Sequence, residues 1–352
     1  MREWESNVRK VVPYVPGEQP KDQRAIKLNT NENPYPPSPM VEEALRELAA
    51  EPMRRYPDSA AQQLVDAIAK EQGVKPEQIF VGVGSDDVLA LAFLTFFNSG
   101  KPILFPDITY SFYDVWADLF RIPYECPPLN DRFEIVKEDY YRENGGVIFP
   151  NPNAPTGVLM PLAEVEAIIA HNRKVIVIVD EAYIDFGGSS AVSLLEKYDN
   201  LLVVQTFSKS RSMAGMRIGY AVGNADLIRC LNDVKYSFNS YSMNQTAITL
   251  GTAAALDHTY FEKTRQKIIA TRERTKKEMA ALGFRFADSQ ANFLFVTHES
   301  AQAGELLEAL KEAGIYVRYF KRPRIENYLR ITIGTDEEMD ELLAFLRKYL
   351  KR

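Results

Sequence analysis

The sequence predicts an α/β protein with a large domain on a mostly parallel, doubly wound sheet, a smaller α+β domain and an extended N-terminal arm. From residue 79 to about 240, short apolar segments alternate with helical ones. Continuous apolar runs such as VIVIV at 175–179 are typical of strands covered on both faces. After residue 240 a long charged helical region leads into mixed strands and helices.

The first forty residues predict an arm (1–40) that belongs with the small domain. Its segments VVPYVPGEQP and LNTNENPYPPSP are rich in proline and asparagine, which oppose a long helix. Apolar residues such as Tyr14 and Leu28 would anchor the arm to the rest of the protein or to a partner.

The large domain (41–243) is expected to begin with helices at 40–50 and 60–72, the second ending at Gly73. Its expected strands are 79–83, 102–105, 146–149, 175–179, 201–206 and 219–222. The small domain (244–352) is expected to start with a broken helix over 244–280. A strand (292–296), a helix (301–313), strands near 316–319 and 329–333 and a terminal helix (336–349) would follow.

Composition excludes several classes of function. The net charge of −6 argues against a nucleic-acid or anionic-membrane partner. The three histidines and two cysteines lie far apart without metal-binding spacing, so we expect no metal site. The longest apolar run, 88–97, is about half a membrane span, and the first ten residues do not form a signal peptide, so the protein is expected to be cytoplasmic.

Lys209 is the first candidate for chemistry. A lone lysine in a loop is most often an ordinary surface residue, but this one follows a buried strand, where open α/β sheets bind ligands. Small neighbours leave it accessible, and a partly desolvated lysine forms a Schiff base with an aldehyde. Arg217, eight residues later, has the fork geometry that binds a phosphate.

Asp180 ends the most apolar strand, so its carboxylate needs a cationic or hydrogen-bonding partner. It could cap a helix or bind magnesium, but no GxxxxGK[ST] motif accompanies it. The functional alternative is a partner for a protonated pyridine nitrogen, with Tyr183 close enough to reach an oxygen of the same ring.

Two loops complete the candidate site. At FVGVGSDDV, 80–88, a strand ends in a glycine turn, and Ser85, Asp86 and Asp87 are capping candidates for a helix whose free N–H groups would hold a phosphate. Asp87 replaces the third glycine of a dinucleotide motif, which disfavours that fold. In FPNPNAPTG, 149–157, three prolines make the loop rigid. The loop is either a simple turn or a support that places Asn153 against a planar ligand.

Four motifs in this order resemble those of the fold-type I, pyridoxal-phosphate-dependent aminotransferases across essentially the whole chain: GSD at 84–86, NPNAPTG at 151–157, DEAY at 180–183 and SKSRSMAGMR at 208–217. Further segments resemble the branch that acts on histidinol phosphate: PYVPG at 13–17, LNTNENPYPPSP at 28–39, RRYPD at 54–58 and YVRYFKRPRIENYLRITIGT at 316–335.

The resemblance implies pyridoxal 5'-phosphate as cofactor, attached to Lys209 by a Schiff base, with the same lysine later moving the substrate proton. Asp180 would pair with the pyridine nitrogen, so that the ring withdraws electrons. Tyr183 would bond the ring's phenolate oxygen, and Tyr110 would stack on the ring.

The cofactor phosphate would be bound by the backbone of Ser85 and Asp86 and by the side chains of Ser208 and Arg217. Tyr56 would reach the phosphate in the neighbouring subunit. The resemblance therefore implies a homodimer with shared active sites.

Tyr14, Arg318 and Arg330 would bind substrate. The implied reaction moves an amino group between L-histidinol phosphate and 2-oxoglutarate or glutamate, in histidine biosynthesis, with ping-pong kinetics. Arg330 would accept a phosphate in one half-reaction and a carboxylate in the other, and a guanidinium fits both anions.

The sequence departs from the family at Ala154, where an asparagine usually precedes Pro-Thr-Gly, so the phenolate contact is expected to move to Asn153. Alternatives are an aromatic amino-acid aminotransferase and an amino-acid-phosphate decarboxylase on the same scaffold. A cofactor-binding regulator or an inactive scaffold is disfavoured, because Lys209 and Asp180 are intact and no basic extension is present.

Overall fold

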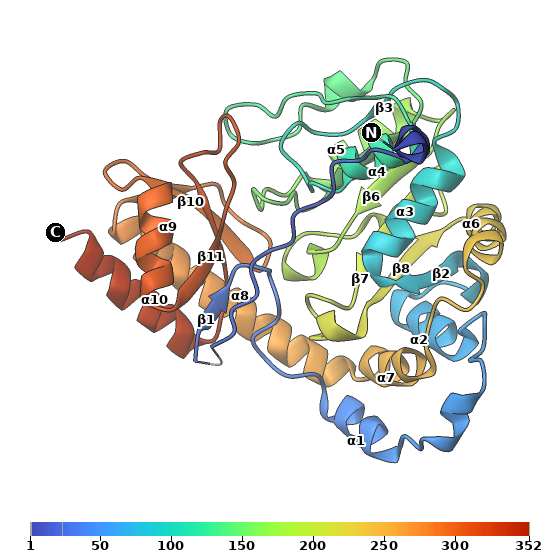
Figure 1. The fold of residues 1–352 in the computed structure, drawn as a ribbon, viewed down its shortest axis with the longest axis horizontal. Coiled ribbons are helices and arrows are strands. Elements are labelled where there is room, and N and C mark those ends of the chain that lie inside the picture. The colour runs from blue at the N-terminus through green and yellow to red at the C-terminus, as the bar shows by residue number, and fades with distance from the viewer. Residues whose placement is uncertain (1, 23, 352) are drawn as a thin grey trace.

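The structure, a computed structural model, describes residues 2–22 and 24–351. Its larger sheet has seven strands in the order β2-β8-β7-β6-β5-β3-β4 (Figure 1). β8 runs antiparallel to both of its neighbours, and all other pairs are parallel, which confirms the predicted mostly parallel sheet. The strands are β2 (Ile79–Val83), β3 (Ile103–Leu104), β4 (Tyr124–Glu125), β5 (Val147–Pro150), β6 (Val177–Asp180), β7 (Leu201–Thr206) and β8 (Ile218–Gly223).

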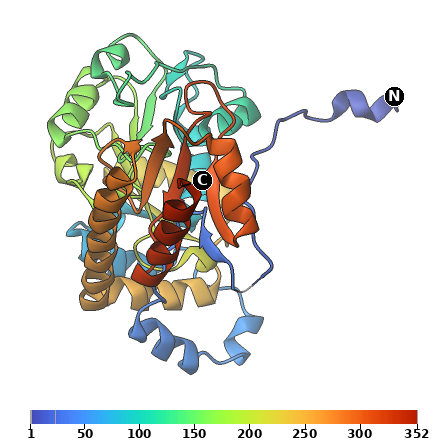
Figure 2. The ribbon, with the colours of Figure 1, turned by 90° about the vertical axis from the view of Figure 1, so that its left-hand side faces the viewer.

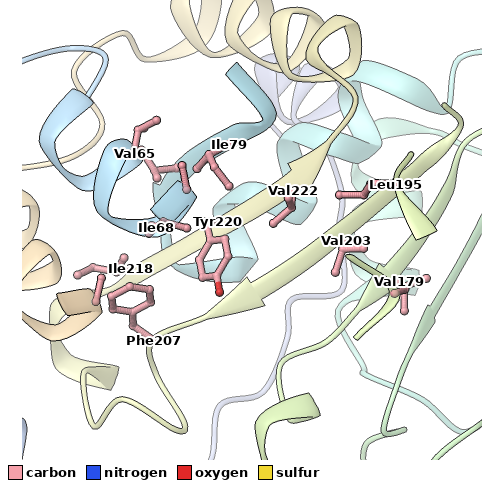
Figure 3. Packing of buried hydrophobic residues seen from close by; sticks show 14 of the residues in the cluster. Val65, Ile68, Ile79, Val179, Leu195, Val203, Phe207, Ile218, Tyr220 and Val222 are labelled. Carbon is pink, nitrogen blue, oxygen red and sulfur yellow. The ribbon is translucent and has the colours of Figure 1, made fainter. Parts of the chain in front are cut away.

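Helices cover both faces of this sheet, because alternate residues of its strands enter two separate cores. Val179 and Val203 point into one core, shown in Figure 3, while their neighbours Ile178 and Leu202 enter the other. The first core is closed by α2 (Gln62–Gln72), α5 (Leu162–His171) and α7 (Gln245–Leu256), and the second by α3 (Gly84–Phe96), α4 (Tyr113–Phe120) and α6 (Ala225–Phe238).

The smaller sheet has the order β1-β11-β12-β10-β9 and a core of its own. β1 from the arm pairs parallel to β11, which attaches the arm to this sheet. The strands are β1 (Ile26–Leu28), β9 (Phe284–Phe286), β10 (Phe293–His298), β11 (Ile315–Tyr319) and β12 (Leu329–Thr332), and the helices packed with them are α8 (His258–Ala281), α9 (Ala303–Glu312) and α10 (Asp336–Tyr349).

The packing of α7 shifts the expected domain boundary at residues 243/244. α7 lies against α1 (Pro39–Glu47) and α2, and its apolar residues, among them Ile248 and Leu250, belong to the core of the large sheet. The chain then breaks at Asp257, whose side chain caps α8 by accepting from the Tyr260 N–H at 3.1 Å. The small domain therefore begins with α8.

The start of the arm, including a 3₁₀ turn at Glu3–Asn7, extends away from the body of the molecule in Figure 2. Among residues 2–22 and 24–351, no helix combines the length and the apolar character needed to cross a membrane.

Candidate active site

A cavity of ≈ 370 Å³ lies where β6 and β7 end at their carboxyl ends, and residues of the arm also line it. Open α/β sheets bind ligands at this edge. Among the predicted site residues, those that line the cavity are Tyr14, Ser85, Asp86, Tyr110, Asp180, Tyr183, Ser208, Lys209, Arg217, Arg318 and Arg330. Segments far apart in the sequence thus meet in one place.

Lys209 follows β7 and reaches across the cavity to the arm. Its Nζ donates to the carbonyl oxygen of Thr30 at 2.9 Å. Burial, assisted by the positive charge of Arg330, lowers the pKa of the Lys209 amine to about 8. A substantial fraction of this amine is therefore neutral and nucleophilic in mildly basic solution. Sequence reasoning missed Thr30, because a backbone carbonyl has no signature in the side-chain pattern.

Asp180 is the last residue of β6 and is only 5% exposed. Its Oδ2 accepts from the Tyr113 hydroxyl at 2.8 Å, and its Oδ1 accepts from the Ala182 N–H at 3.2 Å. Burial outweighs both hydrogen bonds and raises the pKa of the carboxyl to about 6. Within the described residues no cationic side chain pairs with Asp180, so a cationic ring nitrogen would supply the missing partner.

Two tyrosine hydroxyls stay protonated in the cavity. Tyr110 donates to Asp86 Oδ1 at 2.7 Å, and Tyr183 accepts from Asn31 Nδ2 at 2.9 Å. Burial raises the pKa of both hydroxyls. Each is therefore a neutral donor or acceptor at physiological pH.

Arg217, Ser208 and the start of α3 form an anion cradle. Arg217 Nη2 pairs with Asp86 Oδ2 at 2.8 Å, and its Nη1 lies 3.5 Å from Ser208 Oγ. No side chain caps α3 at Val83, so the capping expected of its first acidic residues does not occur. Asp87 instead accepts from the Val83 N–H at 2.9 Å, which leaves the first N–H groups of the helix available to an anion.

Two more arginines lie at the arm side of the cavity. Arg330 Nη2 donates to the Asn29 carbonyl oxygen at 3.0 Å, while its buried Nε has no hydrogen-bond partner. Arg318 Nη2 donates to the Val15 carbonyl oxygen at 3.1 Å. Tyr14 stacks on Phe112 with ring centroids 4.2 Å apart. These contacts place two cations and an aromatic ring at one end of the cavity.

Asn153 and Tyr56 do not line this cavity. Asn153 is buried behind its loop, where its Nδ2 donates to the Ile108 carbonyl oxygen at 3.1 Å and to Thr156 Oγ1 at 2.9 Å. Ala154 lines the cavity in its place and has no polar side chain. The expected contact of Asn153 with a ring oxygen therefore does not fit the structure. Tyr56 is 81% exposed on the outer surface.

Comparison with known proteins shows the family of this chain. The profile of the family "Aminotransferase class I and II" matches residues 23–346. The chain belongs to this family. Its two-sheet α/β architecture is the fold that the resemblance implied.

Curated relatives extend over nearly the full chain. The histidinol-phosphate aminotransferase of Lactococcus lactis subsp. cremoris (strain MG1363) is 51% identical over 348 residues, covering 99% of this chain and 98% of the relative. That of Clostridium acetobutylicum is 51% identical over 345 residues, covering 98% of each chain.

Solved structures agree in fold. The histidinol-phosphate aminotransferase of Sinorhizobium meliloti, in complex with pyridoxal-5'-phosphate, aligns with a TM-score of 0.83 at 25% identity, covering 93% of this chain and 91% of that one. The L-threonine-O-3-phosphate decarboxylase of Porphyromonas gingivalis aligns with a TM-score of 0.77 at 21% identity, covering 93% of this chain and all of that one. The second likeness shows the fold alone.

Proposed function

We propose that this aminotransferase moves an amino group between L-histidinol phosphate and 2-oxoglutarate or glutamate, with pyridoxal 5'-phosphate held at Lys209. The observation that supports this most strongly is the meeting of Lys209, Asp180 and Arg217 in one cavity with Arg330 at its arm side. The curated relatives at 51% identity are named histidinol-phosphate aminotransferases, and this similarity favours histidinol phosphate as the substrate.

The side chains present fit the cofactor. The amine of Lys209 matches its aldehyde, the uncompensated carboxylate of Asp180 matches a protonated ring nitrogen, and the cradle around Arg217 matches its phosphate. Tyr183 also lines the cavity and would contact the ring oxygen. Tyr110, which also lines the cavity, would stack on the ring.

When bound, pyridoxal phosphate supplies a carbonyl that captures amines and a ring that withdraws electrons from the substrate carbon. Lys209 would hold the group, and its Nζ would accept and return the substrate proton. Asp180 would favour positive charge at the ring nitrogen, because its own carboxylate is otherwise buried without a cation.

The arginines at the arm side bind the substrate's anionic end. The buried Nε of Arg330 has no hydrogen-bond partner within the described residues. A guanidinium binds both a phosphate and a carboxylate in bidentate fashion, so one site serves the amine donor and the 2-oxo acid in turn. Tyr14 of the arm and Arg318 of β11 also line the cavity and would belong to this substrate site.

We further propose a cytoplasmic homodimer with shared sites. Tyr56 is exposed and stacks on Tyr241 at 4.7 Å between ring centroids, while Phe238 nearby in the chain is 72% exposed. Exposed aromatic side chains of this kind are typical of interfaces. A second copy seated here would bring Tyr56 toward the partner's cofactor phosphate.

Trapping of the lysine tests the role of Lys209. The cofactor-loaded protein should be yellow, and borohydride should bleach it and leave the reduced cofactor on Lys209 in peptide mapping. The Lys209→Ala variant should bind cofactor non-covalently and show no turnover. Label on another lysine, or turnover by Lys209→Ala, would refute the proposed function.

A further inference from the structure

On its side away from the cavity, the loop that carries Lys209 makes contacts through residues that the proposed function does not use. Ser208 and Lys209 line the cavity, whereas Ser210 and Arg211 do not. Ser210 donates through Oγ to Asp185, and its carbonyl oxygen accepts from Asn33 Nδ2 at 3.0 Å. Consecutive residues of this loop are therefore divided between the cavity and the interior.

Arg211 makes the most extensive of these interior contacts. Its side chain is 6% exposed, and its Nη2 pairs with Glu71 Oε1 of α2 at 2.7 Å. Its Nη1 donates to the Ala254 carbonyl oxygen of α7 at 3.0 Å, and the guanidinium lies 4.2 Å from the ring centroid of Phe261 in α8. A planar cation held by an ion pair, a hydrogen bond and an aromatic ring has little freedom to move.

The backbone beside Arg211 adopts a conformation that needs such support. Ser212 has a φ of 60°, in the left-handed region that residues other than glycine rarely occupy. This conformation is strained and persists only where the surroundings determine it. Arg211 lies directly before Ser212 and supports this conformation through its contacts with three helices.

We propose that Arg211 is a positioning residue for Lys209. Its contacts with α2, α7 and α8 hold the loop so that the amine two residues earlier points into the cavity. This inference rests on the role of Lys209 in the proposed function. A misplacement of a reacting group by about 1 Å lowers a rate about 100-fold, so a loosened loop should reduce turnover without removing the substrate site.

The test uses the cofactor-loaded enzyme with Arg211→Met, which keeps side-chain length and the apolar contact but removes the charge. Arg285→Met is the matched control, because the Arg285 side chain is 71% exposed on β9 and pairs with Glu299 on the surface. For Arg211→Met we expect kcat to fall about 10- to 100-fold, KM to stay within about threefold, and the visible circular dichroism of the bound cofactor to weaken. The control should match the unmodified enzyme in all three.

Two further variants separate positioning from general stability. Arg211→Lys keeps a cation beside Glu71 but not the second hydrogen bond, and its kcat should lie between those of the unmodified enzyme and Arg211→Met. If Arg211→Met does not fold, Ser210→Ala removes only the hydroxyl that holds Asp185 and should still lower kcat with little change in KM.

Several outcomes would overturn the inference: a kcat of Arg211→Met within twofold of its control, an effect on KM alone, or unchanged circular dichroism. With Ser210→Ala as the only folded variant, an unaltered kcat would do the same. Failure of the unmodified protein to attach the cofactor at Lys209 would instead refute the proposed function. The borohydride experiment measures this attachment before any variant is made.

Discussion

Asp180 and Lys209 share one cavity, and burial disfavours the charged form of both. The pKa of Asp180 rises to about 6, and that of Lys209 falls to about 8. For Lys209 the shift favours the neutral amine that reacts with a carbonyl. For Asp180 it is a cost that a cationic ring nitrogen would offset. The same physical effect therefore has opposite consequences at the two residues.

Replacing Asp180 with asparagine should stabilise the cofactor-free protein and impair the enzyme. Ionisation of Asp180 occurs near its ordinary pKa of 3.8 in the unfolded chain and near 6 in the folded one, so stability is lost as pH rises through this window. Asp180→Asn should therefore raise the free energy of unfolding by about 1–3 kcal/mol at pH 7, and the gain should shrink toward pH 4. Urea denaturation at both pH values measures it.

Activity of the loaded Asp180→Asn enzyme should fall about 100-fold, because a neutral amide does not hold positive charge at the ring nitrogen. Asp226→Asn is the control, since the Asp226 side chain is 83% exposed and pairs with Arg229 on the surface. Equal loss of stability in both variants, or full activity of Asp180→Asn, would contradict the role given to Asp180.

At the scale of residues, the sequence predicted the charged residues that stand in recognisable motifs. Lys209 follows a buried strand, Asp180 ends one, and Arg217 comes shortly after Gly215, so their place in the cavity could be inferred. The contact of Tyr113 with Asp180 could not, because a tyrosine inside a helix looks like an ordinary core residue. The orientation of Asn153 depends on the fold of its loop, which the motif alone does not determine.

Among the elements, α3 and β8 meet so closely that glycine is required between them. A Cβ on Gly219 would lie 2.2 Å from the backbone nitrogen of Ser85, at the start of α3. The N–H groups proposed to hold the cofactor phosphate can therefore keep their position only because residue 219 of β8 has no side chain.

Gly219→Ala should force α3 away from β8. We expect destabilisation by about 1–3 kcal/mol and a weaker affinity for cofactor, both measurable by thermal denaturation with and without pyridoxal phosphate. Gly304→Ala is the control, because a Cβ there meets nothing within 4 Å and alanine favours the α9 helix. The idea fails if the two variants bind cofactor equally well.

The buried strands were the easiest elements to predict. The expected strand at 201–206 coincides with β7, because a continuous apolar run at that length is typical of a covered strand. β4 was missed because its two residues are both exposed. β9 was missed because three residues are too short for the alternation of Phe284, Arg285 and Phe286 to stand out. β1 was missed because it lies within a segment dominated by proline and asparagine.

On the scale of the whole molecule, the net charge of −6 conceals a local cluster of cations. Arg217, Arg318, Arg330 and Lys209 all line one cavity, although acidic residues prevail in the chain as a whole. The overall charge could not show this cluster, because the cluster is assembled from β11, β12 and the loop after β7.

Tyr56 tests the proposed sharing of sites between subunits. Tyr56→Phe removes one hydroxyl but keeps the ring that stacks on Tyr241. We expect the dissociation constant of pyridoxal phosphate to rise about tenfold, since a hydrogen bond to a charged group contributes about 1.5 kcal/mol or more. Tyr236→Phe, at another exposed tyrosine, should leave it unchanged. A monomer in analytical ultracentrifugation, or equal affinities of the two variants, would contradict the shared site.

The proposed enzyme takes the amino group from histidinol phosphate in the cavity around Lys209. The most direct measurement mixes the loaded enzyme with histidinol phosphate or with phenylalanine in a stopped-flow spectrometer, without any 2-oxo acid, and follows the loss of the yellow absorbance. We predict that histidinol phosphate bleaches the enzyme about 100-fold faster, because only this amine carries a phosphate for Arg330. A faster reaction with phenylalanine would refute the proposed substrate and favour an aromatic amino-acid aminotransferase.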